Sequence, residues 1–217
     1  MPADPPRWQV LHEELLAAVD AEGRRLGAHP ALSGPHEQDD VARWLSTVLH
    51  VAVQTNLWAQ ADRPGFVEIT GPTLRWGGDN PDATYAHVAL SPDHTYLVRV
   101  RPGSAVYSSL TVYGGPRDGH YSTRIVGGIR LDEVPVGADG WCELVLGRDL
   151  DGRPGIVLGD DTEVGVTRDY YRERVGRVPT AWTIEVLDGP GPEADPVVGG
   201  LERTIRSEEH TSELQSL

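Results

Sequence analysis

The sequence contains no lysine and has only one cysteine, one methionine and one phenylalanine among its 217 residues. All 19 basic residues are therefore arginine, which is typical of a GC-rich genome such as that of an actinobacterium, because lysine codons are rich in A and T. The single cysteine, Cys142, excludes an internal disulfide framework and a metal site built from several thiolates. Its alternation with Leu144 and Leu146 predicts that Cys142 points into a core.

Positive charge and long apolar runs are also scarce. The net charge is −14 at pH 7, and a field of that sign repels phosphate backbones and anionic lipid surfaces. We therefore expect neither a nucleic acid nor a membrane as a partner. The most apolar helical stretch, residues 41–58, is not expected to span a bilayer because it carries polar side chains such as Arg43 and His50. No secretory signal is visible, so we expect a cytoplasmic location.

The last residues of the chain form an unusual string. Residues 206–216 read RSEEHTSELQS, which resembles the in-frame translation of a common sequencing adapter. We expect residues 206–217 to be a non-native tail and residues 191–205 to be a linker or the start of a truncated further segment. The tail holds one arginine and three glutamates, so the net charge without it is −12.

The hydrophobic pattern changes its period near Phe66. Before this point, helical spacing predicts two amphipathic helices over residues 8–26 and 39–61, within a helical region 1–64. After it, short alternating runs separated by turn residues predict an antiparallel β-sandwich or barrel over residues 65–190. The predicted strands cover residues 66–70, 74–76, 83–90, 95–101, 105–113, 123–131, 141–146, 163–167 and 181–187.

Two consecutive predicted strands, 95–101 and 105–113, supply the main candidate for a binding surface. Alternation places Arg99 and Arg101 on one side of the first strand, and Tyr107 and Tyr113 on one side of the second. If the two strands pair as a hairpin, one sheet face gathers guanidinium and hydroxyl groups. Such a face binds a carboxylate or a sugar through forked hydrogen bonds and aromatic contacts. The alternative is an ordinary solvated outer face of a sandwich.

The loop over residues 77–82, GGDNPD, is a second candidate. Asp79, Asn80 and Asp82 make a polar corner that could orient a ligand or bind a hard cation through oxygen atoms. Asx and glycine residues are also what any sharp corner prefers, and the spacing matches no calcium-binding loop.

The remaining candidates are histidines and a charged aromatic segment. His87, His94 and His120 show no paired spacing that would place two of them on one face, so no metal site is expected. Arg168 with its neighbours Tyr170 and Tyr171 could close one end of the binding face or form an exposed turn.

Three stretches, residues 77–115, 137–147 and 166–190, together resemble the domain-of-unknown-function family numbered 1214, a bacterial family often found beside the family numbered 1254. The resemblance rests on the Asn-Pro-Asp loop with the following Tyr85, on the strand pair expected around residues 96–113, on the hairpin expected at Asp139 and Gly140, and on Arg168 with its aromatic neighbours. It implies a β-sandwich of jelly-roll type and no assigned activity.

Three functions are compatible with these patterns. The first is a β-sandwich that binds a small polar ligand, a saccharide or a carboxylate, without a cofactor or a metal; its candidate ligand-binding residues are Asn80, Tyr85, Arg99, Arg101, Tyr107, Tyr113, Arg168 and Tyr171. The second is a hydrolase or lyase that uses Asp79 or Asp82 as acid and base and arginines to hold an anion. The third is an interaction module whose N-terminal helices pair between subunits of a homo-oligomer.

Overall fold

A computed structural model describes residues 5–77, 80–116, 122–173 and 175–188. Within these residues the chain forms two compact units, one running to Trp58 and the other beginning at Ala59. The predicted linker and tail, together with Asp79 and His120, lie outside the described residues.

The first unit contains the two predicted helices, α1 (Arg7–Gly27) and α2 (Pro35–Val53). A short 3-10 turn (Pro30–Leu32) joins them, and α2 continues into a π-helical turn (Gln54–Trp58). Helix α2 begins four residues earlier than predicted because a proline fits the first turn of a helix, where its missing N–H is not needed. Among the described residues, no helix combines the length and the apolar character needed to cross a membrane.

The apolar stripe of α2 is covered. Val41 and Val48 are buried, and Trp44 and Leu45 between them are half-buried. An exposed stripe would have favoured the interaction module. The oligomer therefore stays a prediction from the sequence, without support from this surface.

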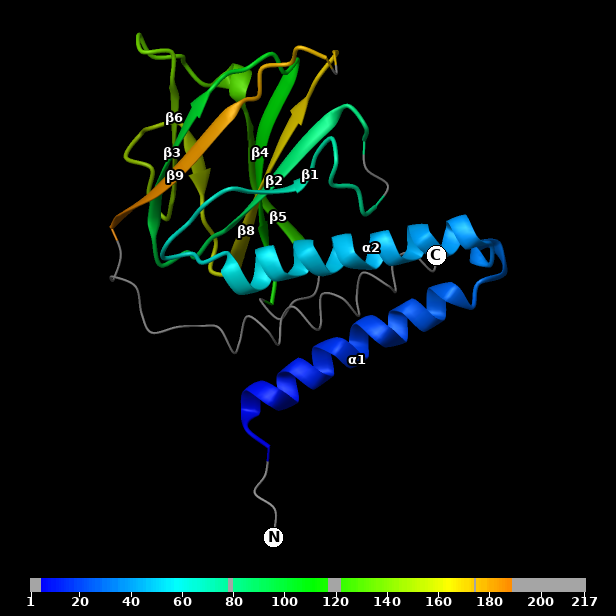
Figure 1. Cartoon of the computed structure of the whole chain (residues 1–217). Helices are drawn as coiled ribbons and strands as arrows, with labels where there is room; N and C mark the ends of the chain where they lie inside the picture. The colour runs from blue at the N-terminus through cyan, green and yellow to red at the C-terminus, as the bar shows by residue number, and fades with distance from the viewer. Residues whose placement is uncertain (1–4, 78–79, 117–121, 174, 189–217) are drawn as a thin grey trace. The chain divides into compact units, whose positions relative to one another are not determined.

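The second unit consists of two sheets, as the alternating pattern predicts (Figure 1). The five-stranded sheet has the order β1 (Val67–Thr70), β2 (Ala83–Ala89), β8 (Thr162–Tyr170), β4 (Tyr107–Gly114) and β5 (Arg124–Arg130). The four-stranded sheet has the order β7 (Gly155–Val157), β6 (Cys142–Gly147), β3 (Thr95–Arg101) and β9 (Ala181–Asp188). All neighbouring strands are antiparallel except β6 and β7. The mainly β, sandwich-like fold is thereby confirmed.

A single apolar core fills the β unit. Val88 and Leu110 of the five-stranded sheet and Val98 and Leu144 of the four-stranded sheet belong to one buried cluster. Cys142 belongs to the same cluster and is fully buried, so its predicted place in the core is confirmed. Burial raises the pKa of its thiol, as expected for a small apolar residue rather than a nucleophile.

The predicted hairpin of β3 and β4 is wrong. Strand β3 pairs with β6 and β9, whereas β4 pairs with β8 and β5, so the two strands belong to different sheets. The segment that connects β3 to β4 is instead hydrogen-bonded to a part of the chain that is distant in sequence, because Ser104 N donates to Val178 O at 2.8 Å. A Cβ on Gly103 would lie 2.2 Å from the same Val178 oxygen, so only glycine allows this close passage.

The structure differs from the prediction at three further places. Residues 74–76 form no strand; instead the indole of Trp76 donates to the Ile69 carbonyl at 2.6 Å. Strand β7 was not predicted because its three residues are too short to show a period. Gly140, with φ 81°, does form a tight turn, but the strands on either side, β5 and β6, lie in different sheets and make no hairpin.

Candidate functional site

The alternation of the central strand β8 creates a polar aromatic surface on the outer side of the five-stranded sheet. Thr167 and Asp169 point into the sandwich, so Arg168 and Tyr170 point outward. The strand register adds residues from both neighbouring strands to the same side, since directly paired residues share a face. Four of the seven tyrosines gather there, and we call this surface the tyrosine–arginine face; it comprises Tyr85, Tyr107, Tyr113, Arg168 and Tyr170.

The guanidinium of Arg168 lies at the centre of the tyrosine–arginine face. Its Nη2 donates to Tyr113 Oη at 2.7 Å and its Nη1 donates to Thr111 Oγ1 at 3.2 Å. Its Cζ lies 5.7 Å from the ring centre of Tyr85 and 5.8 Å from that of Tyr113, within cation–π range of both. These four contacts fix the orientation of the guanidinium.

Arg168 carries a positive charge that is not neutralised by any of the residues that the structure describes. Within the described part of the chain, no carboxylate forms an ion pair with it. Arg130, which pairs with Ser109 next to Arg168 in the register, is by contrast bound to the carboxylate of Asp132. The face therefore presents one uncompensated guanidinium.

Three tyrosines form a row beside that charge. The rings of Tyr85 and Tyr170 meet edge to face at 6.3 Å, and the rings of Tyr170 and Tyr107 stack at 5.3 Å with 20° between their planes. Tyr107 is 37% exposed and ends the row. Aromatic rings in such contact form a rigid apolar surface with hydroxyl groups at its edge.

His87 lies on the same side of the sheet, opposite Val166. Its Nδ1 is buried and has no hydrogen-bond partner among the described residues. Burial lowers the pKa of His87 to about 4, so the imidazole is neutral near pH 7. A neutral imidazole beside an uncompensated arginine adds no further positive charge to the face.

The depressed pKa of His87 predicts acid destabilisation. Between pH 6.5 and about 4 the unfolded chain binds a proton at His87 that the folded protein does not bind, so the free energy of unfolding falls with falling pH by at most about 3 kcal/mol. Burial raises the pKa of Asp169, which has the opposite effect in its own window. His87→Phe should flatten the acid limb in urea titrations at pH 7, 6, 5 and about 4.5. An unchanged limb would show that His87 is protonated in the folded state.

Asp169 lies directly behind the face, on the inner side of β8. Only 3% of it is exposed, and its carboxylate accepts hydrogen bonds from Ser108 Oγ at 2.5 Å and from Trp182 Nε1 at 2.9 Å. Because Trp182 belongs to β9, this carboxylate links the two sheets. Burial raises its pKa, and the hydrogen bonds from Ser108, Trp182 and Thr180 oppose that shift. Asp169 is thus a structural support for the strand that carries Arg168.

The structure brings together four of the predicted ligand-binding residues and separates two others. Tyr85, Tyr107, Tyr113 and Arg168 lie on the tyrosine–arginine face. Arg99 and Arg101 lie on β3 in the other sheet, so the prediction that they border Tyr107 and Tyr113 is wrong. Arg99 is occupied there by Asp139 at 3.0 Å and Glu143 at 3.2 Å, and its guanidinium lies over the ring of Trp141.

Tyr171 does not lie on the face either. It is 5% exposed, its hydroxyl accepts from Thr180 N at 3.3 Å, and its own N–H donates to Asp82 O at 2.8 Å. Its predicted role at the surface is therefore wrong, because β8 ends at Tyr170 and the next residue turns inward. Tyr170, which the sequence named only as a neighbour of Arg168, lies on the outer side of the sheet, as does Thr111; neither was among the candidate ligand-binding residues.

The Asn-Pro-Asp corner is held together from within. Asn80 Oδ1 accepts from Asp82 N at 2.9 Å, and the guanidinium of Arg75 donates to the carbonyls of Asn80 and Pro81, each at 2.9 Å. These hydrogen bonds account for the conformation of the corner, so they give no evidence that Asn80 binds a ligand. Asp82 is half-buried, and Asp79 lies outside the described residues. The acid–base alternative gains no support from this corner.

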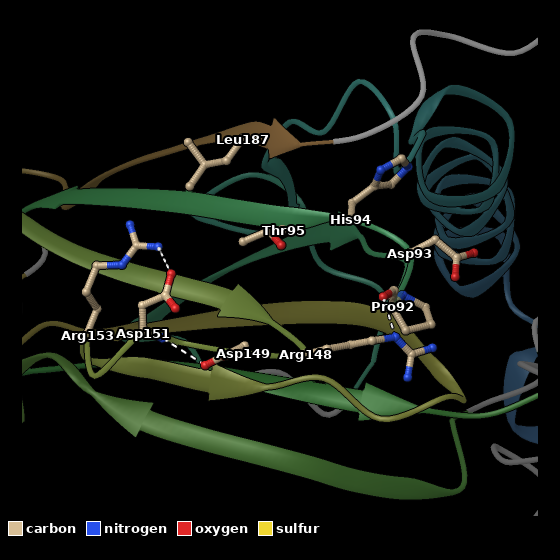
Figure 2. Close-up of a pocket in the computed structure, with 9 residues that line it drawn as sticks. All are labelled: Pro92, Asp93, His94, Thr95, Arg148, Asp149, Asp151, Arg153 and Leu187. Carbon is tan, nitrogen blue, oxygen red and sulfur yellow. Dashed lines mark hydrogen bonds and ion pairs between the residues drawn. The ribbon is translucent and has the colours of Figure 1, made fainter.

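A separate pocket of about 650 Å³ opens at the other sheet, between the turn that precedes β3 and the loop that follows β6 (Figure 2). Its lining residues are Pro92, Asp93, His94, Thr95, Arg148, Asp149, Asp151, Arg153 and Leu187. Arg148 is paired with Asp160 at 2.6 Å and bound to Pro92 O at 3.0 Å, and Figure 2 shows His94 turned away from Asp149 and Asp151. In the described ranges, no cluster of histidine, cysteine or acidic side chains is arranged to hold a metal ion.

Comparison with known proteins bears on the fold alone. No protein-family model and no curated protein sequence matches the chain. A crystal structure of an uncharacterised protein from Burkholderia cenocepacia is 24% identical, with a TM-score of 0.80 over 96% of this chain and 58% of that one. The VPA0106 protein from Vibrio parahaemolyticus is 16% identical over 54% of this chain and 34% of that one, with a TM-score of 0.40. This chain thus shares the fold of the Burkholderia protein and spans 58% of its length.

Proposed function

We propose that this chain binds a small polar ligand with an anionic group, and that the tyrosine–arginine face is the binding surface. The observation that supports the proposal is the guanidinium of Arg168, fixed by Tyr113 and Thr111 and unpaired with any described carboxylate. Hydrogen bonds to a charged partner are about twice as strong as neutral ones, so an anion in this position gains more than a neutral ligand.

The rigidity of the face favours binding. Arg168 is held by two hydrogen bonds and two rings before any ligand arrives, so little side-chain freedom remains to be lost on association. The surrounding protein is strongly acidic, with a net charge of −14. Long-range repulsion therefore slows the approach of anions, and short-range contacts with Arg168 must supply the affinity.

Several finer features of the chain belong to the same proposal. On the sequence patterns described above, we propose that the chain is related to family 1214 and that jelly-roll connections join its two sheets. We also propose that it is located in the cytoplasm. Binding without catalysis is preferred to hydrolase or lyase chemistry, because Asp82 belongs to a hydrogen-bonded corner rather than to the tyrosine–arginine face.

A ligand panel tests the proposal through melting temperatures. Uronic acids, aliphatic and aromatic carboxylates and neutral sugars, each at about 10 mM, are added to the wild type and to Arg168→Gln. At least one carboxylate should raise the Tm of the wild type by several degrees, and Arg168→Gln should lose that shift while remaining folded. Arg99→Gln is the matched control, since Arg99 is an arginine on the outer side of the other sheet, and it should keep the shift. A shift of equal size in Arg168→Gln would contradict the proposal.

A further inference from the structure

We infer that the ligand of the tyrosine–arginine face is a monoanion whose carboxylate is joined directly to a six-membered ring. This inference rests on the proposed function and adds the chemical class of the ligand. Two sources supply that chemistry, a uronic acid and an arene carboxylic acid, and the experiment below distinguishes them.

The charge of the face indicates a single negative charge on the ligand. Among the described residues of the face, Arg168 is the cation without an ion pair; Arg130 is neutralised by Asp132, and His87 is neutral near pH 7. A dianionic phosphate would keep one unbalanced charge in a protein that is already acidic. A carboxylate matches one guanidinium in both charge and geometry, because its two oxygens accept two parallel N–H bonds.

The free donors of Arg168 can reach such a carboxylate. A guanidinium has five N–H donors, and the hydrogen bonds to Thr111 and Tyr113 use one from each terminal nitrogen. Both of these partners belong to β4, so the side chain is anchored on one side. Within the described ranges its other N–H groups form no hydrogen bond, so they are available to a ligand.

The tyrosine row indicates a ring next to the carboxylate. Arg168 Cζ is 5.7 Å from the centre of the Tyr85 ring, and Tyr85 in turn contacts Tyr170. The anion-binding group and the aromatic surface therefore adjoin. A carboxylate bonded directly to a ring places that ring against the tyrosines, whereas an acid with a long spacer carries its ring past them. Both a sugar ring and an arene can lie against such a surface.

Isothermal titration calorimetry at pH 7 and low salt tests the inference with four probes. D-glucuronate and benzoate carry the carboxylate on a ring, D-glucose carries a ring without the carboxylate, and acetate carries the carboxylate without a ring. We expect at least one ring acid to bind the wild type about tenfold more tightly than both glucose and acetate. The tighter ring acid identifies the source, sugar or arene.

Variants separate the contributions of charge and ring. Arg168→Gln and Arg168→Lys should both weaken the ring acid, the lysine variant less, because an ammonium keeps the charge but not the fork. Tyr107→Ala should weaken the ring acid about threefold or more and leave acetate unchanged, while Tyr107→Phe, which keeps the ring, should bind like the wild type. Tyr107 is 37% exposed and does not belong to the buried core cluster, so Tyr107→Ala shortens the row without opening the core.

Each contrary result has one meaning. Acetate binding as tightly as both ring acids, with dependence on Arg168, would overturn the inference and leave the proposed function intact. Glucose binding as tightly as glucuronate would overturn it as well, since the carboxylate would then contribute nothing. No binding of any probe, or binding that Arg168→Gln and Arg168→Lys leave unchanged, would overturn the proposed function itself.

Discussion

Asp169→Ala should destabilise the β unit by about 3 kcal/mol, because it removes a buried carboxylate that accepts from two partly buried donors at once. The indole N–H of Trp182 and the hydroxyl of Ser108 both point at the Asp169 carboxylate, which is 3% exposed. An unpaired buried donor costs about 1–3 kcal/mol, and a partly buried one costs less. The Trp182 indole loses its acceptor, whereas Ser108 Oγ keeps Thr180 Oγ1 at 3.4 Å, and the space left by the carboxylate adds to the loss. Since Trp182 and Ser108 belong to different sheets, the change also loosens one end of the sandwich. Urea unfolding followed by tryptophan fluorescence measures the effect.

Two further variants make the Asp169 result interpretable. Asp169→Asn keeps the side-chain volume and one carbonyl acceptor, so it should cost about half as much as Asp169→Ala. Asp160→Ala removes a carboxylate that is 90% exposed although it is paired with Arg148, and it should change the free energy of unfolding by less than about 1 kcal/mol. A loss below about 1 kcal/mol in Asp169→Ala would mean that the carboxylate is solvated and does not join the sheets.

Gly155→Ala is the second large effect, with an expected loss of about 3 kcal/mol or more. Gly155 opens β7 and pairs with Val145 of β6, and a Cβ at this position would lie 1.8 Å from the Val145 carbonyl oxygen. Backbone cannot move aside as a flexible side chain can, so β7 must separate from β6. That movement withdraws Ile156, which is 5% exposed, from the core.

Gly65→Ala is the matched control for Gly155→Ala. No atom lies within 4 Å of the position that its Cβ would take. We expect no loss, or a gain of a few tenths of a kcal/mol from the reduced freedom of the unfolded chain. Equal free energies of unfolding for the two alanine variants in denaturant titrations would contradict the parallel pairing of β6 and β7.

The sequence predicted the elements of this fold far better than their partners. Alternation correctly assigned most strands and the inward direction of Cys142, because alternation is a property of one strand alone. Strand pairing depends on where the connections go. Residues 102–106 look like a short hairpin turn, yet Ser104 is bound to Val178, which is distant in sequence, and the chain crosses to the other sheet.

For the candidate site, too, the residue types were predicted better than their neighbours. Arg168, Tyr107 and Tyr113 were recognised as ligand-binding types, but Tyr107 and Tyr113 were assigned Arg99 and Arg101 as neighbours, whereas β8 inserts Arg168 beside β4. The predicted strand ended at Thr167, three residues before β8 does. The prediction therefore did not say which side of the sheet Arg168, Tyr170 and Tyr171 face. It named Tyr171 as a ligand-binding residue, whereas Tyr170 lies on the face. A predicted strand that ran to Tyr170 would have placed Tyr170, rather than Tyr171, on the same side as Arg168.

The claim that Arg168 is the anion-binding group can be measured at the guanidinium itself. In protein labelled with ¹⁵N-arginine, the Nε–H resonances of Arg168 and Arg99 are assigned with Arg168→Lys and Arg99→Lys and followed during a titration with D-glucuronate and with benzoate. We predict a saturable shift of the Arg168 resonance with at least one of the two acids, while the Arg99 resonance, held by Asp139 and Glu143, stays in place. An Arg168 resonance that does not move with either acid, or moves only together with that of Arg99, would contradict the assignment of this face as a binding site.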